Sequence, residues 1–125
     1  MIHDQNIYAG FGGGGTNAVI SYNVGEFLTS NPKEITVYND NVDTGPTGVA
    51  FDKVGNIYIS EYYTPSWVKY SSAGKLLLSV RGTSQGLNGP EGIALDSSGN
   101  VYVSNTYGNN ITEYNPAGTL TCTYN

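Results

Sequence analysis

Few side chains in this 125-residue sequence belong to the types that carry covalent or metal chemistry. The chain has one histidine, His3, and one cysteine, Cys122. A lone histidine has no evident partner for general-base catalysis, and a lone thiol can form neither an intrachain disulfide nor a cysteine-based zinc site. We therefore assign no catalytic residue, and we expect a binding protein rather than an enzyme.

Three side chains with oxygen donors occupy positions that differ between two copies of an internal repeat: Glu61, Glu91 and Asn105. A residue that changes between copies is not explained by the structural needs that the copies share. Carboxylate and amide oxygens are the ligands that Ca²⁺ accepts. These residues are therefore our candidates for holding Ca²⁺ or another divalent cation, and the alternative is that they are ordinary solvated polar side chains.

Aromatic side chains gather in the same part of each copy. Tyr62 and Trp67 differ from their repeat counterparts, whereas Tyr63 and Tyr107 correspond to each other. Tyrosine and tryptophan offer large flat surfaces at a low cost in conformational entropy, which suits contacts with sugars and peptides. We predict that Tyr62 and Trp67 contact a protein, peptide or glycan ligand, with packing between neighbouring sheets as the alternative.

The elements that position these side chains follow from the internal repeat. The segment Gly45–Asp52 recurs as Gly89–Asp96, an offset of 44 residues, and the register then holds without a gap. From these two glycines onward, 14 of 36 aligned pairs are identical. A looser copy precedes them at the N-terminus, so the chain is built from repeated units.

Each unit contains four short runs of β-branched, aromatic or leucine residues bounded by glycine, proline, asparagine or serine, which is typical of strands joined by tight turns. Asp52 and Asp96 recur at the first turn, and we predict that each bonds the turn amides; a shared metal is the alternative. Nothing carries a helical stripe. In the second unit the runs are 48–52, 56–60, 67–70 and 75–80.

Four antiparallel strands in about 44 residues are typical of one β-propeller blade. The pattern Gly-Pro-x-Gly-(Val/Ile)-Ala-x-Asp-x-x-Gly-Asn-(Ile/Val)-Tyr-(Ile/Val)-Ser resembles the NHL repeat of six-bladed propellers. The resemblance covers residues 45–125 well and residues 6–44 loosely. It is specific for the architecture of a blade and weak for function.

We accordingly predict an all-β partial β-propeller of about 11 antiparallel strands in a single domain, 1–125. Residues 45–88 and 89–125 form two complete four-stranded blades, and residues 1–44 form a blade that lacks its inner strand. Sheets at both ends of such an array leave an apolar face uncovered. Two readings stay open: a segment of a longer propeller, or self-association of two chains to complete a ring.

The resemblance also implies two functions. One is a binding scaffold that acts through the loop face of its blades. The other is part of a divalent-metal hydrolase, because the related gluconolactonase and regucalcin-like enzymes hold a central cation with Glu, Asn and Asp from such loops; here the matching positions are Glu61, Glu91 and Asn105. Lyases of related propellers rely on several histidines, which this sequence lacks.

The amino-acid composition limits the classes of partner and the compartment that we expect for this chain. The formal net charge is −5 and only five residues are Lys or Arg, so we expect no nucleic-acid partner. No apolar run is long enough to span a membrane, and Met1–Asp4 lacks the basic start of a signal peptide. The wealth of Thr, Asn and Tyr resembles extracytoplasmic NHL proteins, which suggests that compartment.

Overall fold

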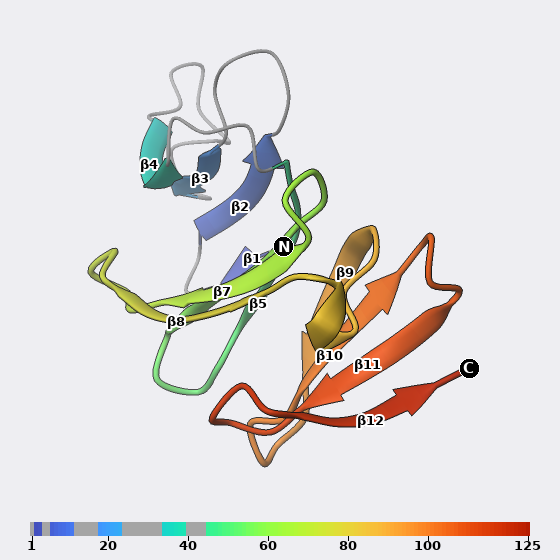
Figure 1. The fold of residues 1–125 in the computed structure, drawn as a ribbon. Coiled ribbons are helices and arrows are strands. Elements are labelled where there is room, and N and C mark those ends of the chain that lie inside the picture. The colour runs from blue at the N-terminus through green and yellow to red at the C-terminus, as the bar shows by residue number, and fades with distance from the viewer. Residues whose placement is uncertain (1, 4–5, 12–17, 24–33, 40–44) are drawn as a thin grey trace.

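The computed structural model describes the backbone of residues 2–3, 6–11, 18–23 and 34–39, and every residue from 45 to 125 with its side chain. The described residues form three four-stranded antiparallel sheets (Figure 1). No helix among them is long and apolar enough to cross a membrane. The fold is all-β and consists of propeller blades, as the repeat predicts.

The first sheet has the order β1-β2-β3-β4. Its strand β1 corrects one detail of the prediction: Ile2 and His3 pair with Ile7 and Asn6, so the first blade has a short inner strand and the described residues hold twelve strands rather than eleven. A two-residue strand is too short to show an alternating pattern. The four strands are β1 (Ile2–His3), β2 (Asn6–Phe11), β3 (Ala18–Asn23) and β4 (Glu34–Asn39).

The second and third sheets repeat each other strand by strand. Both ladders of the outer hairpin shift register at the same place, between Lys69 and Tyr70 and between Glu113 and Tyr114. A short 3-10 helix, η1 (Thr83–Gln85), connects the two sheets. The second sheet is β5 (Pro46–Phe51), β6 (Ile57–Glu61), β7 (Ser66–Tyr70) and β8 (Leu76–Arg81); the third is β9 (Pro90–Leu95), β10 (Val101–Asn105), β11 (Asn110–Tyr114) and β12 (Leu120–Tyr124).

The first turn of each complete blade is organised by its aspartate, as predicted. Asp52 accepts hydrogen bonds from the backbone N–H of Val54 at 3.1 Å and of Asn56 at 2.9 Å, and from the Asn56 side chain at 2.8 Å. Asp96 accepts the equivalent bonds from Ser98 and Asn100, at 2.8–2.9 Å. This shared network of hydrogen bonds accounts for the recurrence of the aspartate, and no ligand is needed to explain it.

These turns predict a loss of stability in acid. Burial raises the pKa of Asp52, but hydrogen bonds from Asn56 and Val54 lower this pKa by more than burial raises it. For Asp96 the largest effect on the pKa is the lowering by the hydrogen bond from the Asn100 side chain. Both folded pKa values therefore lie below the ordinary 3.8. A depressed carboxyl pKa stabilises the fold above the unfolded pKa, and this contribution disappears as pH falls through the folded pKa. We expect the free energy of unfolding to decrease below about pH 4. Denaturant titrations between pH 2 and 6 should show a shallower decrease for a D52N/D96N double variant, and an unchanged pH slope would contradict this assignment.

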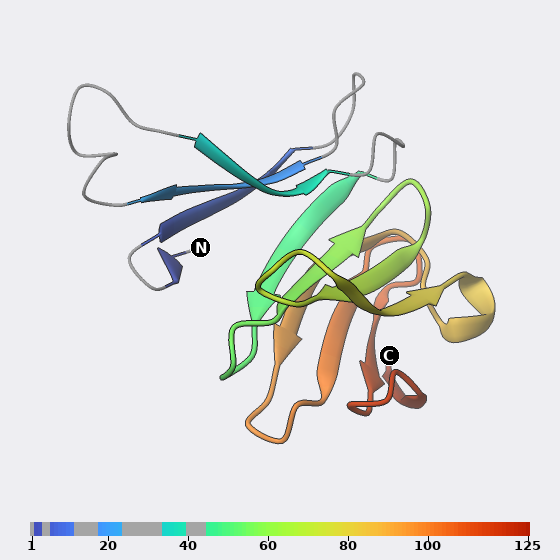
Figure 2. The ribbon, with the colours of Figure 1, turned by 90° about the vertical axis from the view of Figure 1, so that its left-hand side faces the viewer.

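The second and third sheets pack face to face with their inner strands close together (Figure 2). Two hydroxyl groups of the second sheet reach the backbone of β9: Ser60 Oγ donates to the Glu91 carbonyl at 2.7 Å and Thr47 Oγ1 donates to the Pro90 carbonyl at 3.1 Å. The strand β2 of the first sheet lies against β5 as β6 lies against β9. The three sheets are therefore consecutive blades.

Candidate functional site

The candidate site lies where the β6–β7 loop and the β10–β11 loop follow the second strands of the two complete blades. Each loop is tied to the segment that enters its inner strand. The N–H of Tyr62 donates to the Gly45 carbonyl at 2.8 Å, and the N–H of Thr106 donates to the Gly89 carbonyl at 2.9 Å. These equivalent bonds fix both loops at one end of the blades, which we call the loop face.

Two tyrosine rings cover glycines at this face. A Cβ atom on Gly45 would lie 2.7 Å from the Tyr63 ring, and one on Gly89 would lie 2.8 Å from the Tyr107 ring. Both glycines also have φ +67°, which side chains rarely adopt. The two tyrosines recur because of this packing, yet they remain 62% and 67% exposed. Packing and availability to a ligand therefore coexist in the same rings.

Tyr62 joins the two covered glycine sites into one surface. Its ring centroid lies 5.5 Å from that of Tyr63, edge to face, and 5.7 Å from that of Tyr107, at an interplanar angle of 51°. Hydrogen bonding with Tyr107, and then burial and the negative charge of Glu91, raise the pKa of Tyr62 to about 12. We call Tyr62, Tyr63 and Tyr107 the tyrosine cluster; it spans the second and third blades.

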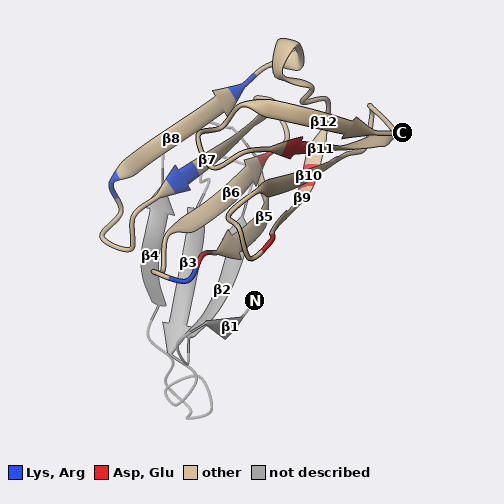
Figure 3. Ribbon diagram, turned by 90° about the horizontal axis from the view of Figure 1, so that it is seen from below, with Lys and Arg blue, Asp and Glu red and all other residues tan. Residues whose placement is uncertain are grey.

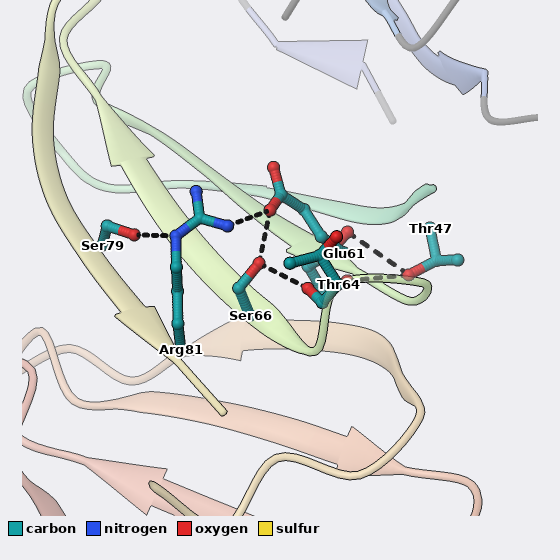
Figure 4. Close-up of polar contacts among 7 residues, drawn as sticks. Thr47, Glu61, Thr64, Ser66, Ser79 and Arg81 are labelled. Atoms are coloured by element: carbon teal, nitrogen blue, oxygen red, sulfur yellow. Dashed lines mark hydrogen bonds and ion pairs between the residues drawn. The ribbon is translucent and has the colours of Figure 1, made fainter. Parts of the chain in front are cut away.

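Glu61 ends β6 directly before this cluster and is fully buried. Its carboxylate accepts a hydrogen bond from Ser66 Oγ and lies 3.7 Å from Arg81 Nη1 (Figure 4). The guanidinium also donates from Nε to Ser79 Oγ at 2.9 Å. Glu61 thus joins β6, β7 and β8 within its own blade.

Asn105 is the counterpart of Glu61 in the repeat, and its side chain likewise connects neighbouring strands, here in the third blade. Its Oδ1 accepts the backbone N–H of Asn88 at 3.0 Å, and its Nδ2 donates to Thr112 Oγ1 at 3.0 Å and to Asn110 Oδ1 at 3.1 Å. The side chain is 2% exposed. Its polar atoms therefore hold the segment that enters β9 against β10 and β11.

The predicted cation ligands lie in contrasting surroundings. Glu61 and Asn105 are buried and bonded within separate blades, whereas Glu91 is exposed and acts electrostatically on Tyr62. A cation at Glu61 would compete with Arg81 for the carboxylate. Carboxylate oxygens suit Ca²⁺ chemically, but those of Glu61 and the amide of Asn105 already have partners within their blades, so Ca²⁺ binding by Glu61, Glu91 and Asn105 stays a prediction.

A calcium titration checks it. If Glu61 is a ligand, removing its competitor in an R81A variant should enlarge the rise in melting temperature that millimolar CaCl₂ produces, because binding to the folded state alone stabilises it. An R81A/E61Q variant, measured in parallel, should lose that rise. Melting temperatures that do not respond to CaCl₂ in the wild type or in R81A would remove Glu61 from the candidate ligands.

Trp67, the second predicted ligand contact, requires a correction of its location. The side chain is 0% exposed and lies in the core, with ring centroids 6.2 Å from Tyr58 and 5.4 Å from Tyr114 of the next blade. The packing alternative therefore describes Trp67, and of the two predicted contacts Tyr62 alone lies at the loop face. Sequence reasoning also left out Arg81 and Ser66, because nothing in the pattern pairs them with Glu61.

One cavity lies at the loop face and another lies between the first turns of the blades. A hollow of about 130 Å³ lies against the tyrosine cluster and is lined by Gly45, Pro46, Thr47, Tyr62 and Tyr63. A larger one, about 460 Å³, lies between the first turns of the two complete blades and includes Asp52 and Asp96. The carboxylates of the larger cavity already bond the turns, whereas the smaller hollow adjoins exposed tyrosine rings of the loop face.

Comparisons with known proteins agree with the geometry. The model of the NHL repeat family matches residues 87–114. No curated protein matches the chain significantly. The solved structures that share the fold include a protein of unknown function from Bacteroides caccae (TM-score 0.72, 15% identity, 99% of this chain and 43% of that one), a streptogramin B lyase (0.74, 17%, 97% and 38%) and a luciferin-regenerating enzyme (0.62, 16%, 85% and 36%).

The similarities to solved structures support a conclusion about the fold. At 15–17% identity they show the fold and not the activity of the matched proteins. The chain spans 36–43% of the length of the structures that it matches. Together with the NHL match in the third blade and the repeat that relates it to the second, they identify the chain as consecutive β-propeller blades that include a segment matching the NHL repeat.

Proposed function

We propose that the chain is a binding scaffold whose loop face presents the tyrosine cluster to a protein, peptide or glycan ligand. The observation that carries this proposal is the exposure of Tyr63 and Tyr107, at 62% and 67%, in rings already immobilised over glycine backbone. Rings that are held in place lose little further entropy when a ligand contacts them. The rigid sheets beneath supply the support that such a surface needs.

The hydrolase alternative finds less support in this geometry. Metal-assisted hydrolysis needs an ion with an open coordination position beside a positioned base. Glu61 and Asn105, which would supply two of the ligands, instead bond their own blades. Binding through the tyrosine cluster uses groups that the fold leaves exposed, and it is the function that the site favours.

A panel of immobilised peptides and oligosaccharides tests the proposal. A ligand of the loop face should lose at least about tenfold in affinity when two of the three rings, the central one and an exposed one, are removed in a Y62A/Y107A variant, because stacked aromatic contacts carry much of such binding energy. Y124A is the matched control, since Tyr124 is a 48% exposed tyrosine on β12. Binding that resists Y62A/Y107A, or that Y124A weakens equally, would exclude the tyrosine cluster as the site.

A further inference from the structure

A carboxylate without a side-chain partner stands beside the tyrosine cluster. Glu91 is exposed on β9, and its backbone carbonyl, not its side chain, accepts the bond from Ser60. Among the residues that the structure describes, no side chain forms an ion pair or hydrogen bond with its carboxylate. Glu91 lies two residues after Gly89, the glycine that the Tyr107 ring covers, and its charge contributes to the raised pKa of the Tyr62 hydroxyl. The cluster therefore combines three rings with one free negative charge.

The surroundings of this charge contain little that could neutralise it. Residues 82–125 include Glu91, Asp96 and Glu113 but no Lys or Arg. The basic residues of the described region lie on the second blade, in β7, at both ends of β8 and in the β5–β6 turn (Figure 3). Arg81, at the end of β8, is held by Glu61 and Ser79. The third blade therefore brings the charge of Glu91 and no basic residue to the loop face.

Aromatic faces and a carboxylate together favour one kind of ligand. The face of a tyrosine ring has negative potential, and cations within about 6 Å of a ring centroid are attracted to it. Organic ammonium groups suit such a surface best, because their alkyl groups contact the rings while the charge is balanced by a carboxylate. A sugar hydroxyl also donates hydrogen bonds to a carboxylate, but unlike an ammonium group it does not neutralise the negative charge.

Resting on the proposed binding function, we propose that the surface of Tyr62, Tyr63, Tyr107 and Glu91 binds an organic ammonium group, either a free small molecule or the side chain of a lysine in a peptide. The hollow lined by Tyr62 and Tyr63 receives the alkylammonium head, and Glu91 supplies the opposing charge. The proposal narrows the ligand from any peptide or glycan to a cationic one.

A pair of probes of equal shape tests the charge. Choline and its neutral carbon analogue, 3,3-dimethyl-1-butanol, are titrated into the protein while the ring resonances of the tyrosines are followed by NMR. We expect choline to shift the resonances of Tyr62 and Tyr63, which line the hollow, at millimolar concentration, and the neutral analogue to bind roughly tenfold more weakly. A third titration with a Gly-Ser peptide that carries a central lysine separates the two sources, since tighter binding than choline assigns the peptide.

Two substitutions make the test specific to these groups. E91Q should weaken choline binding about threefold to fivefold, because a partly exposed charge contributes that much. Y62F retains a ring and should bind nearly as the wild type does, whereas Y62L should lose about fivefold. E113Q, which removes an acid elsewhere on the third blade, should change nothing.

The outcomes separate this inference from the function on which it rests. Equal affinity for choline and for the neutral analogue overturns the selection of cations, and leaves the loop face as a binding surface. Absence of choline binding and of lysine-peptide binding, with a panel ligand still dependent on Tyr62 and Tyr107, overturns only the ammonium assignment. Loss of choline binding in E113Q as large as in E91Q places the effect in net charge rather than at this site and also overturns it.

Discussion

Replacing Trp67 with alanine is expected to lower the free energy of unfolding by about 3–5 kcal/mol, the largest effect of any single substitution in the described part of the chain. The side chain is fully buried and contacts Tyr58 in its own blade and Tyr114 in the next, so its loss opens a cavity between two sheets. For a domain of this size the melting temperature should fall by roughly 12–20 °C, measured by circular dichroism.

A milder variant keeps this prediction testable if W67A does not fold. The indole Nε1 has no hydrogen-bond partner among the described residues, so W67F removes no hydrogen bond and retains an aromatic ring between Tyr58 and Tyr114. We expect W67F to cost less than half as much as W67A. L77A, at a side chain that is 45% exposed, should stay within about 0.5 kcal/mol of the wild type. A W67F loss equal to that of an alanine would contradict the packing assigned to the ring.

The environment of Trp67 shows where sequence reasoning reaches its limit. Trp67 and Ile111 occupy equivalent repeat positions, on equivalent strands, yet they are 0% and 44% exposed. The difference arises because the third sheet covers that face of the second, whereas the same face of the third sheet is open in this structure. Strand positions follow from local pattern and turn chemistry, but the exposure of a side chain depends on the neighbouring sheet, which a pattern within one blade does not contain.

The candidate ligands divide along the same line. The repeat predicted correctly that Glu61 and Asn105 stand at one place in their blades, directly after the second strand. It could not predict that each would be buried by partners such as Arg81 and Thr112, because those partners lie on other strands and differ between the copies. The difference between the two copies of the repeat singles out Glu91. Its exposure beside Tyr62 depends on how the second and third blades pack, which the repeat does not show.

The glycine of the inner strand is the clearest case of a residue whose role depends on the neighbouring blade. A Cβ atom on Gly48 would lie 2.6 Å from the Glu91 carbonyl oxygen and 3.2 Å from the Ile93 nitrogen, both of them backbone atoms of β9. A Cβ atom on the equivalent Gly92 would meet only the Ser104 side chain, at 2.9 Å, and a hydroxyl can rotate away. Identical positions in the sequence therefore predict unequal costs of substitution.

We expect G48A to lower the free energy of unfolding by about 2–3 kcal/mol, because β9 must move away and the bond from Ser60 Oγ to the Glu91 carbonyl is lost with it. G92A should cost no more than about 1 kcal/mol, because rotation of the Ser104 hydroxyl loses only the exposed hydrogen bond that it accepts from the Gly92 N–H. Urea denaturation of both variants at micromolar protein concentration gives the comparison.

Self-association through the open face of the third sheet, a prediction that the fold leaves untested, would alter this result in a recognisable way. If a blade of a second chain covers Gly92 as β9 covers Gly48, the cost of G92A should rise toward that of G48A as the protein concentration increases, and sedimentation should show a dimer that G92A dissociates. A G48A variant as stable as the wild type would contradict the close approach of the two inner strands, on which the placement of Glu91 beside the tyrosine cluster also depends.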